Sequence, residues 1–383
     1  MLTLGVHRGV DSNEFPARNY GDLAFRTWGT IARHSVNFLQ ALALLLLLGQ
    51  VVILFGLNIV EMSKNQLCYI ICPLIFTVVG FFLGQVRTLR RYGIFANLAI
   101  WLNLLTIFIS MGVIANSAPN YAASASSVGQ DIDPTTITKV NGHYPAIVRY
   151  GGLPTKNLVG SINGLLSGVL AYAGAQLFVE FMAEMRRPRD FLKAMWGAQI
   201  FIYVVYVVYG CFVYYYQGQY TINPSFQGVS TYAWQTVGNT LTLIAGLIAA
   251  GLYGNIGIKV FYNNVMCDLF NAPLITSRSG KIFYAIIVPI WWSIALIIAA
   301  AIPAYFEFVA VISASCLLNL TYTIPPFLAL GYAMQKNSIR LEDGDGFDPS
   351  TGRIGRTGTM VQRWMRGFLS GGPVRVAQNC WVS

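Results

Sequence analysis

Eight long apolar runs divide this chain and restrict the folds that it can adopt. A helix of about 20 apolar residues crosses the hydrocarbon core of a bilayer, and such a helix tolerates almost no charge. Of the 383 residues, 55% are hydrophobic and 10% are charged, whereas a soluble domain has about 25% charged residues. The sequence therefore predicts an all-α integral membrane protein, a helical bundle of about eight transmembrane spans. The predicted spans are residues 38–60, 67–86, 93–115, 158–183, 193–216, 233–257, 281–302 and 305–334.

Basic residues are distributed unevenly between the two ends of these spans. If the N-terminus is placed in the cytoplasm, only four of the 25 Lys and Arg lie on the outer side: Lys64, Lys139, Arg149 and Lys156. Because cytoplasmic loops carry an excess of Lys and Arg, we expect both ends of the chain in the cytoplasm. The net charge of +10 is then explained by the cytoplasmic loops of a membrane protein. We therefore expect the lipid bilayer as a partner, and we do not expect nucleic acid to be one.

This arrangement divides the chain into five segments. Residues 1–37 are expected to form a cytoplasmic N-terminal segment, and residues 38–115 three transmembrane spans. Residues 116–157 form an extracytoplasmic loop, residues 158–334 five further spans, and residues 335–383 a cytoplasmic polar tail with a short basic amphipathic helix at 360–369. The last span is long and holds Asn319 and Pro325-Pro326, so we expect a kink there.

The run at 158–183 differs from the others because it is interrupted near its middle and contains an acid. The interruption consists of Ala171, Tyr172, Ala173 and Gly174. Glu180 follows it, and Glu184 lies four residues later on the same helical face. Irregular backbone at membrane depth persists only where protein or a water-filled cavity satisfies it, which is typical of the binding helix of a transporter. This span is therefore predicted to contribute to a substrate site.

Two interpretations stay open for each of these features. Glu180 and Glu184 would act as gating or coupling residues, or they would form structural ion pairs at the cytoplasmic rim. Backbone groups freed at residues 171–174 could bind the carboxylate or amine of a substrate, or the small residues could simply allow close helix packing. Asn255 in the sixth run could face the same path, although packing alone explains the glycines around it.

No pattern in the sequence indicates an enzyme. It contains no Walker A sequence, no His-Glu-x-x-His and no Gly-x-Ser-x-Gly, and its three histidines lie outside the apolar runs. Cys68 and Cys72 share a helix face, but further ligands for a metal ion are absent nearby. We therefore expect no catalytic residue, no metal site and no cofactor, and any transport would be driven by an ion gradient or run downhill.

Three motifs accompany these spans. One begins at Tyr172 and reads YAGAQLFVEFMAEMRRPRDF, one at Tyr20 reads YGDLAFR, and one at Gly254 reads GNIGIKVFY. Together they resemble the amino acid/auxin permease family, and the fungal neutral amino acid permeases are the most similar. The resemblance extends over about residues 5–368.

The resemblance implies a LeuT-like fold of eleven spans with an inverted repeat of five plus five helices. It also implies secondary active transport of amino acids, neutral ones in particular, with a coupling proton (or Na⁺) and alternating access. Substrate would bind between the broken first and sixth helices, against the third and eighth. The spans at 38–60, 158–183, 233–257 and 305–334 would then correspond to helices three, six, eight and ten.

The chain also departs from the pattern of that family. It begins where the loop after helix two would lie and ends where the last helix would follow Phe368, so we expect an incomplete fold lacking three helices. Ala175 and Val179 stand where relatives often carry His and Pro. The competing hypothesis is a truncated, non-transporting membrane protein, such as a gene-model fragment, a sensor or a regulatory partner. We expect the plasma membrane rather than the vacuolar membrane as its location.

Overall fold

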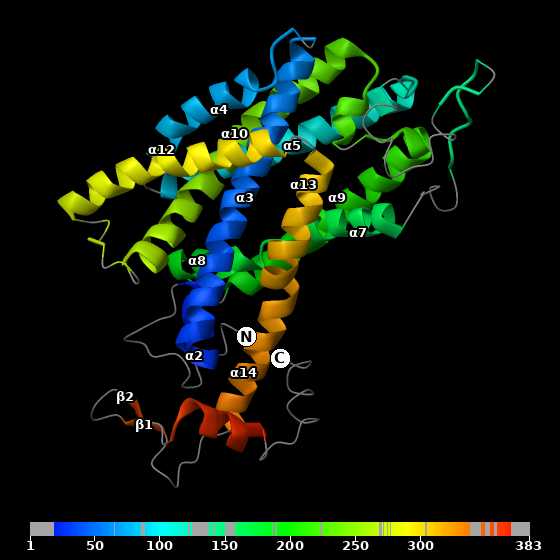
Figure 1. Ribbon diagram of the computed structural model, residues 1–383. Helices are drawn as coiled ribbons and strands as arrows, with labels where there is room; N and C mark the ends of the chain where they lie inside the picture. Colours follow the sequence, from blue (N-terminus) through cyan, green and yellow to red (C-terminus); the bar gives the residue numbers. More distant parts are fainter. Residues whose placement is uncertain are drawn as a thin grey trace.

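The computed structural model shows an assembly of helices with one small pair of antiparallel strands, β1 (Gly346–Asp348) and β2 (Arg353–Gly355) (Figure 1). It describes residues 19–64, 66–85, 89–121, 123–124, 138–140, 142–149, 158–185, 187, 190–222, 224–267, 270, 272–273, 275, 277–302, 305–337, 346–348, 353–355 and 358–368.

Within these described residues, seven helices are long and apolar enough to cross a membrane. They are Thr30–Met62, Phe95–Asn116, Gly160–Met182, Asp190–Tyr220, Tyr232–Cys267, Arg278–Ala301 and Glu307–Met334. The prediction of a multi-span helical membrane protein is therefore confirmed.

The second predicted span, residues 67–86, forms a shorter helix than expected. Helix α4 (Ile71–Leu83) has 13 residues, which corresponds to roughly 20 Å at the helical rise per residue. Residues 69–70 form a turn, and the backbone N–H of Ile71 donates to the carbonyl of Cys68 (3.1 Å). Pro73 lies in the first turn of α4, where proline is tolerated because the N–H groups of that turn have no partner within the helix. The apolar run is thus longer than the helix because residues at both of its ends form turns.

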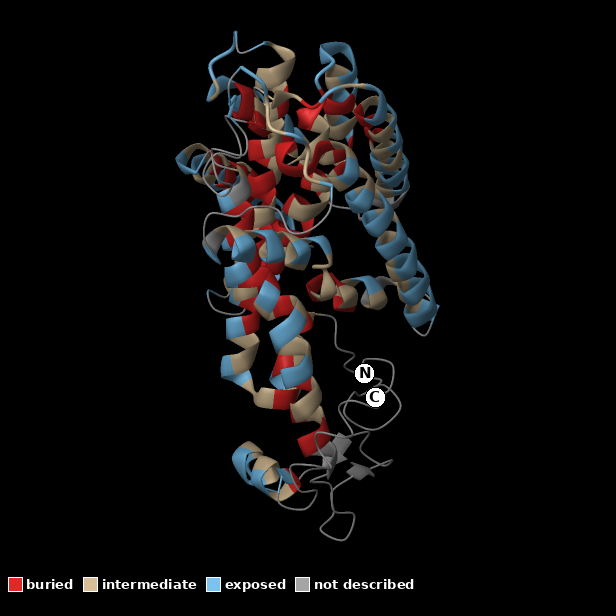
Figure 2. Ribbon diagram, turned by 90° about the vertical axis from the view of Figure 1, so that its right-hand side faces the viewer, coloured by how far each residue is buried: buried red, intermediate tan, exposed pale blue. Residues whose placement is uncertain are grey.

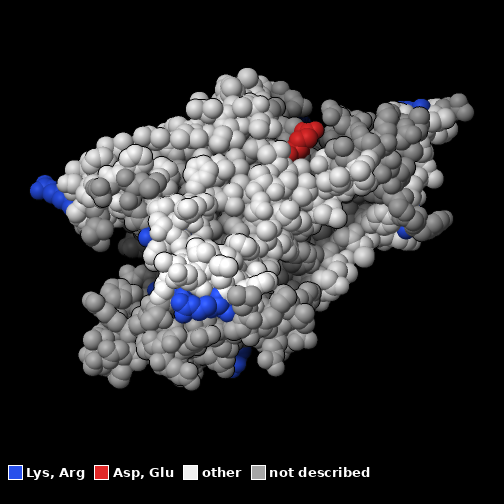
Figure 3. All heavy atoms as spheres, turned by 60° about the horizontal axis from the view of Figure 1, so that its bottom comes forward, with Lys and Arg blue, Asp and Glu red and all other residues white. Residues whose placement is uncertain are grey.

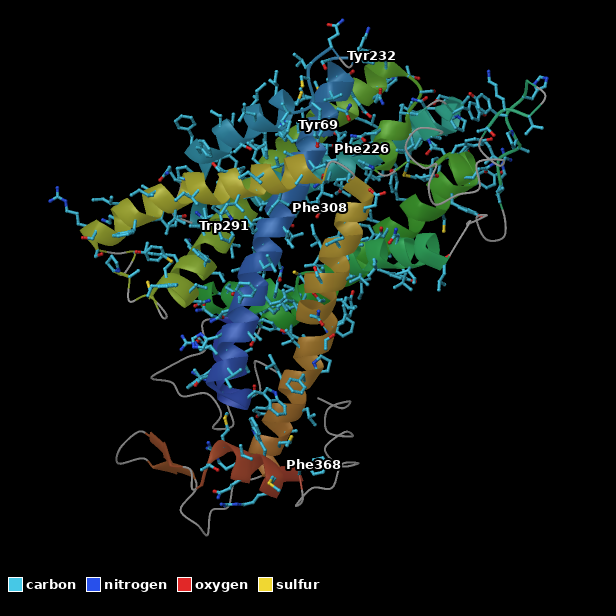
Figure 4. All side chains as sticks on the ribbon, in the orientation of Figure 1. Tyr69, Phe226, Tyr232, Trp291, Phe308 and Phe368 are labelled. Carbon is cyan, nitrogen blue, oxygen red and sulfur yellow. The ribbon has the colours of Figure 1, made fainter. Side chains whose placement is uncertain are left out.

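Helix α3 (Thr30–Met62) is the central element of the fold. It packs against α2 (Tyr20–Trp28), α4, α10 (Tyr232–Phe261), α12 (Arg278–Ala301) and α13 (Tyr305–Ile312). Trp291 of α12 and Phe308 of α13 join Leu44 and Leu48 of α3 in one buried cluster (Figure 4). Figure 2 shows that the buried residues, in red, are concentrated in the helical bundle. Because α3 contacts so many elements, it fixes their positions relative to one another.

Other helices present wide apolar surfaces to the surroundings. Helix α9 (Asp190–Gln217) packs against α5 (Leu89–Asn116), but only Val213 and Gln217 of α9 are buried. Large side chains such as Trp196 and Phe201 are exposed along it. On the face in Figure 3, uncharged residues predominate between scattered Lys and Arg side chains. Such a surface is unusual for a soluble protein and fits contact with lipid.

The last span is irregular where a kink is expected. Helix α13 continues into two π-helical segments, η6 (Ser313–Leu317) and η7 (Asn319–Thr323), before α14 (Ile324–Asn337). Pro325 and Pro326 lack the N–H groups that would bond the carbonyls of Thr321 and Tyr322 in a regular α-helix. The two prolines therefore account for the wider turn that immediately precedes α14.

The contact between α4 and α12 gives a test of this packing. A Cβ at Gly80 of α4 would overlap the ring of Trp292, which is fully buried in α12. We expect Gly80→Ala to destabilise the protein by about 1–3 kcal/mol through overpacking, measured as a lower thermal unfolding midpoint in detergent. Gly112→Ala in α5 is the matched control, because nothing lies within 4 Å of its added Cβ. Equal midpoints for the two variants would contradict the α4–α12 contact.

Candidate functional site: the broken helix against α3

The predicted interruption of the fourth span is confirmed. Helix α7 (Leu158–Ala171) ends at the first residue of the break, and the chain resumes with the 3₁₀ turn η2 (Ala175–Leu177) and helix α8 (Phe178–Glu184). Gly174 lies between them with φ +148°, in a region that L-residues with a side chain rarely adopt. Glycine at this position is therefore a local cause of the break.

Gln40 of α3 joins the central helix to the broken one. Its Nε2 donates hydrogen bonds to the carbonyl of Gln176 in η2 (3.0 Å) and to Oε1 of Glu180 in α8 (2.7 Å). Gln40 is completely buried, and Glu180 is half-buried. A backbone carbonyl at membrane depth needs a partner inside the protein. The side chain of Gln40 supplies that partner. It also binds the carboxyl group of Glu180, the only acid of α8 whose side chain is among the described residues.

The break also lies beside the π-helical part of the last span. The N–H of Gly174 makes a long hydrogen bond to Oγ1 of Thr321 in η7 (3.5 Å). The hydroxyl of Tyr20 in α2 donates to the carbonyl of Leu320 (3.0 Å). Burial, and to a smaller extent the charge of Glu180, raises the pKa of Tyr20 well above its ordinary value. The Tyr20 hydroxyl therefore keeps its proton and remains a donor to this irregular segment.

Two oxygen atoms of the Gln40–Glu180 pair are left without partners. Oε1 of Gln40 and Oε2 of Glu180 are both buried, and neither has a hydrogen bond from any described residue. Both atoms act as acceptors while the carboxyl group is ionised, and protonation would make Oε2 of Glu180 a donor.

The predicted substrate-binding residues have different surroundings. The ring of Tyr172 lies edge-on to that of Tyr206 in α9, with centroids 5.6 Å apart. Ala173 packs against the main buried cluster, Ala171 is exposed, and nothing lies within 4 Å of a Cβ built on Gly174. The break thus has open space at its glycine and an aromatic pair beside it.

Asn255 is buried within α10, and its Nδ2 lies 3.5 Å from the hydroxyl of Tyr284 in α12. Tyr284 in turn donates to the carbonyl of Gly84, which follows α4 (3.4 Å). The structure thus places Asn255 in the α10–α12–α4 contact, and its role in a substrate path stays a prediction. The side chain of Glu184 lies outside the described part of the chain, and its coupling role also stays a prediction.

Sequence reasoning missed the polar residues of α3. Asn37 and Gln40 are three residues apart on one face of α3, either side of the predicted start of the first span, and both are buried. Helix α2 approaches this face so closely that a Cβ at Gly21 would overlap Asn37. The available signal was the presence of amide side chains, Gln40 among them, in an otherwise apolar run, since polar residues inside the membrane are costly and usually have a role.

A second polar cluster lies near the other end of α3. Glu61 accepts hydrogen bonds from Gln235 (3.3 Å) and Asn239 (3.2 Å) of α10. Gln227, in the 3₁₀ turn η4 (Ser225–Gly228), donates to Oδ1 of Asn58 (2.7 Å). Helix α3 therefore takes part in a hydrogen bond to a carboxyl group toward each of its ends, through Gln40 at one end and Glu61 at the other. Glu61 was not among the predicted site residues.

The chain is similar to known membrane transporters. Residues 5–340 match the family described as transmembrane amino acid transporter protein. Over 336 residues the chain is 22% identical to a transmembrane transporter of Fusarium pseudograminearum. The aligned region covers 85% of this chain and 66% of that protein. It is 21% identical over 257 residues to a transmembrane transporter of Gibberella moniliformis, with coverages of 67% and 50%. The chain thus matches half to two thirds of the length of these curated relatives. No solved structure matches it.

The break gives a second test. Gly174→Ala places a side chain where φ is +148°, which we expect to cost about 1–3 kcal/mol in backbone strain. The thermal unfolding midpoint in detergent should fall accordingly. Gly168→Ala in α7 is the matched control, because it too has nothing within 4 Å of the added Cβ but has no positive φ. A Gly174→Ala variant as stable as the control would show that the break does not need this conformation.

Proposed function

Because the chain belongs to the transmembrane amino acid transporter family, we propose that it functions in secondary active transport of amino acids across a membrane. We further infer that the substrates are neutral amino acids, that a proton is the coupling ion and that access alternates between the two sides. The observation that carries this proposal is the broken helix held by Gln40 beside Glu180. Such interrupted helices are typical of substrate sites in transporters.

Residues 171–174 are proposed to contact the substrate through their backbone. A neutral amino acid carries a carboxylate and an ammonium group at one end, and backbone N–H and C=O groups can bind both. The open space at Gly174 supports close approach of a substrate to the backbone. The paired rings of Tyr172 and Tyr206 offer an apolar surface for its side chain. Asn255 and Glu184 are retained as further candidate residues of this path.

Glu180 is proposed to carry the coupling proton. An acid inside a membrane protein is often part of a proton or ion path. The unpartnered oxygens of Glu180 and Gln40 support protonation as one of two stable states of this pair. Because Gln40 also holds the carbonyl of Gln176, a change at Glu180 would alter the contact between α3 and the broken helix. Na⁺ is the alternative coupling ion, and the plasma membrane remains the proposed location.

The test is uptake of radiolabelled leucine and phenylalanine by the purified chain in vesicles under a pH gradient, and separately under a Na⁺ gradient. We expect accumulation with the pH gradient. Glu180→Gln should reduce accumulation to the level of empty vesicles and keep exchange of labelled for unlabelled substrate, since it removes only the titrating group. Glu307→Gln is the matched control, because Glu307 is an exposed acid at the start of α13.

Three results would count against parts of this proposal. If Glu180→Gln still accumulates substrate under a pH gradient, Glu180 is not the coupling residue. If accumulation follows the Na⁺ gradient instead, the coupling ion is wrong. If the parent chain neither accumulates nor exchanges any amino acid, transport by this chain is wrong.

A further inference from the structure

The helix at residues 360–368, here called the tail helix, is docked on the membrane-spanning part of the protein. Nε1 of Trp364 donates to the carbonyl of Thr27 (3.0 Å), and the rings of Trp364 and Trp28 lie 4.7 Å apart. Gly367 lies so close to the backbone of Met334 in α14 that a Cβ would overlap it. In Figure 1 the tail helix lies across the lower end of α14, and Figure 4 places Phe368 there.

This docking places the tail helix at the end of a candidate membrane span. Met334 is the last residue of the helix Glu307–Met334, which is long and apolar enough to cross a membrane. Two tryptophans, Trp28 and Trp364, meet at this level, and tryptophan is enriched at the boundary between lipid and water. Both features are those expected of a helix at the membrane interface.

One stripe of the tail helix is apolar and exposed in the described part of the chain. Val361, Met365 and Phe368 are 58%, 61% and 44% exposed. Their spacing of four and three residues places them on one face of a helix. The docked residues, Met360, Trp364 and Gly367, have the same spacing and form the neighbouring face. The helix therefore has one face against the protein and a second apolar face without a partner among the described residues.

The basic residues lie on the opposite side of the tail helix. At 100° per residue, Arg363 and Arg366 are centred roughly 160° from the apolar stripe. No carboxylate of the described residues forms an ion pair with either guanidinium. A helix with an apolar face toward the hydrocarbon and basic residues on its polar face is typical of binding in the plane of a membrane surface.

We propose that the tail helix is a lipid-binding element whose ligand is an anionic phospholipid leaflet. Val361, Met365 and Phe368 enter the boundary between headgroups and acyl chains, and Arg363 and Arg366 attract anionic headgroups. The contacts with Thr27 and Met334 already hold the helix in place before it meets lipid. Three apolar side chains and two charges are therefore enough for it to bind the leaflet. This inference does not depend on what the protein transports.

The test uses a photoreactive benzoylphenylalanine at Met365 in the full chain, reconstituted in nanodiscs of phosphatidylcholine with or without phosphatidylserine. Mass spectrometry of the tail peptide measures the phospholipid adducts after illumination. We expect abundant adducts in both kinds of nanodisc, with phosphatidylserine enriched above its share of the bilayer. The same probe at Gln362, an exposed position that faces away from the protein and lies roughly 90° from the centre of the stripe, is the matched control and should give fewer adducts.

The double variant Arg363→Gln, Arg366→Gln separates the two parts of the proposal. It should lose the enrichment of phosphatidylserine and keep the phosphatidylcholine adducts at position 365, which also shows that the tail helix is still folded and docked. Equal lipid adducts at positions 362 and 365, or cross-links from 365 to protein instead of lipid, would overturn the lipid-facing stripe. Unchanged enrichment in the double variant would overturn the role of the arginines.

Discussion

The side chain of Gln40 makes the interaction on which the candidate site depends. Breaking a helix inside a membrane leaves backbone groups that lipid cannot satisfy. Gln40 provides an internal donor for the carbonyl of Gln176 and for the carboxyl group of Glu180 at the same time. Because α3 also carries Leu44 and Leu48 of the main buried cluster, the position of this donor is set by the packing of the whole bundle. The broken helix is therefore held by the same helix, α3, that contributes to the core.

Helix α2 connects this site to the tail helix. Near its start, Tyr20 bonds the carbonyl of Leu320 in the π-helical segment beside the break. At its end, Thr27 and Trp28 hold the tail helix through Trp364. Trp28 also stacks on Phe327 of α14, with ring centroids 4.2 Å apart. A displacement of the tail helix would thus act on α2 and α14 together, and both contact the irregular backbone next to Glu180.

The parts of the fold that could be predicted are those with a local cause. Spans follow from hydropathy because a membrane helix must be apolar over its whole length. The break follows from Gly174 and the small residues around it, and the irregular last span follows from Pro325 and Pro326. The length of α4 was mispredicted, since an apolar run does not reveal that its first residues form turns. Gln40 was missed because its importance arises from a contact with a residue 140 positions away.

By itself, the sequence determined that this is a multi-span helical membrane protein of the transmembrane amino acid transporter family, with one interrupted span. These properties depend on residue composition and short motifs, which are the same however the helices pack. Only the tertiary structure decided that Gln40 faces Glu180, that Asn255 lies against α12 and that the tail helix docks at the end of α14. Such pairings depend on how helices distant in sequence rotate and pack against α3, and no local pattern specifies that rotation.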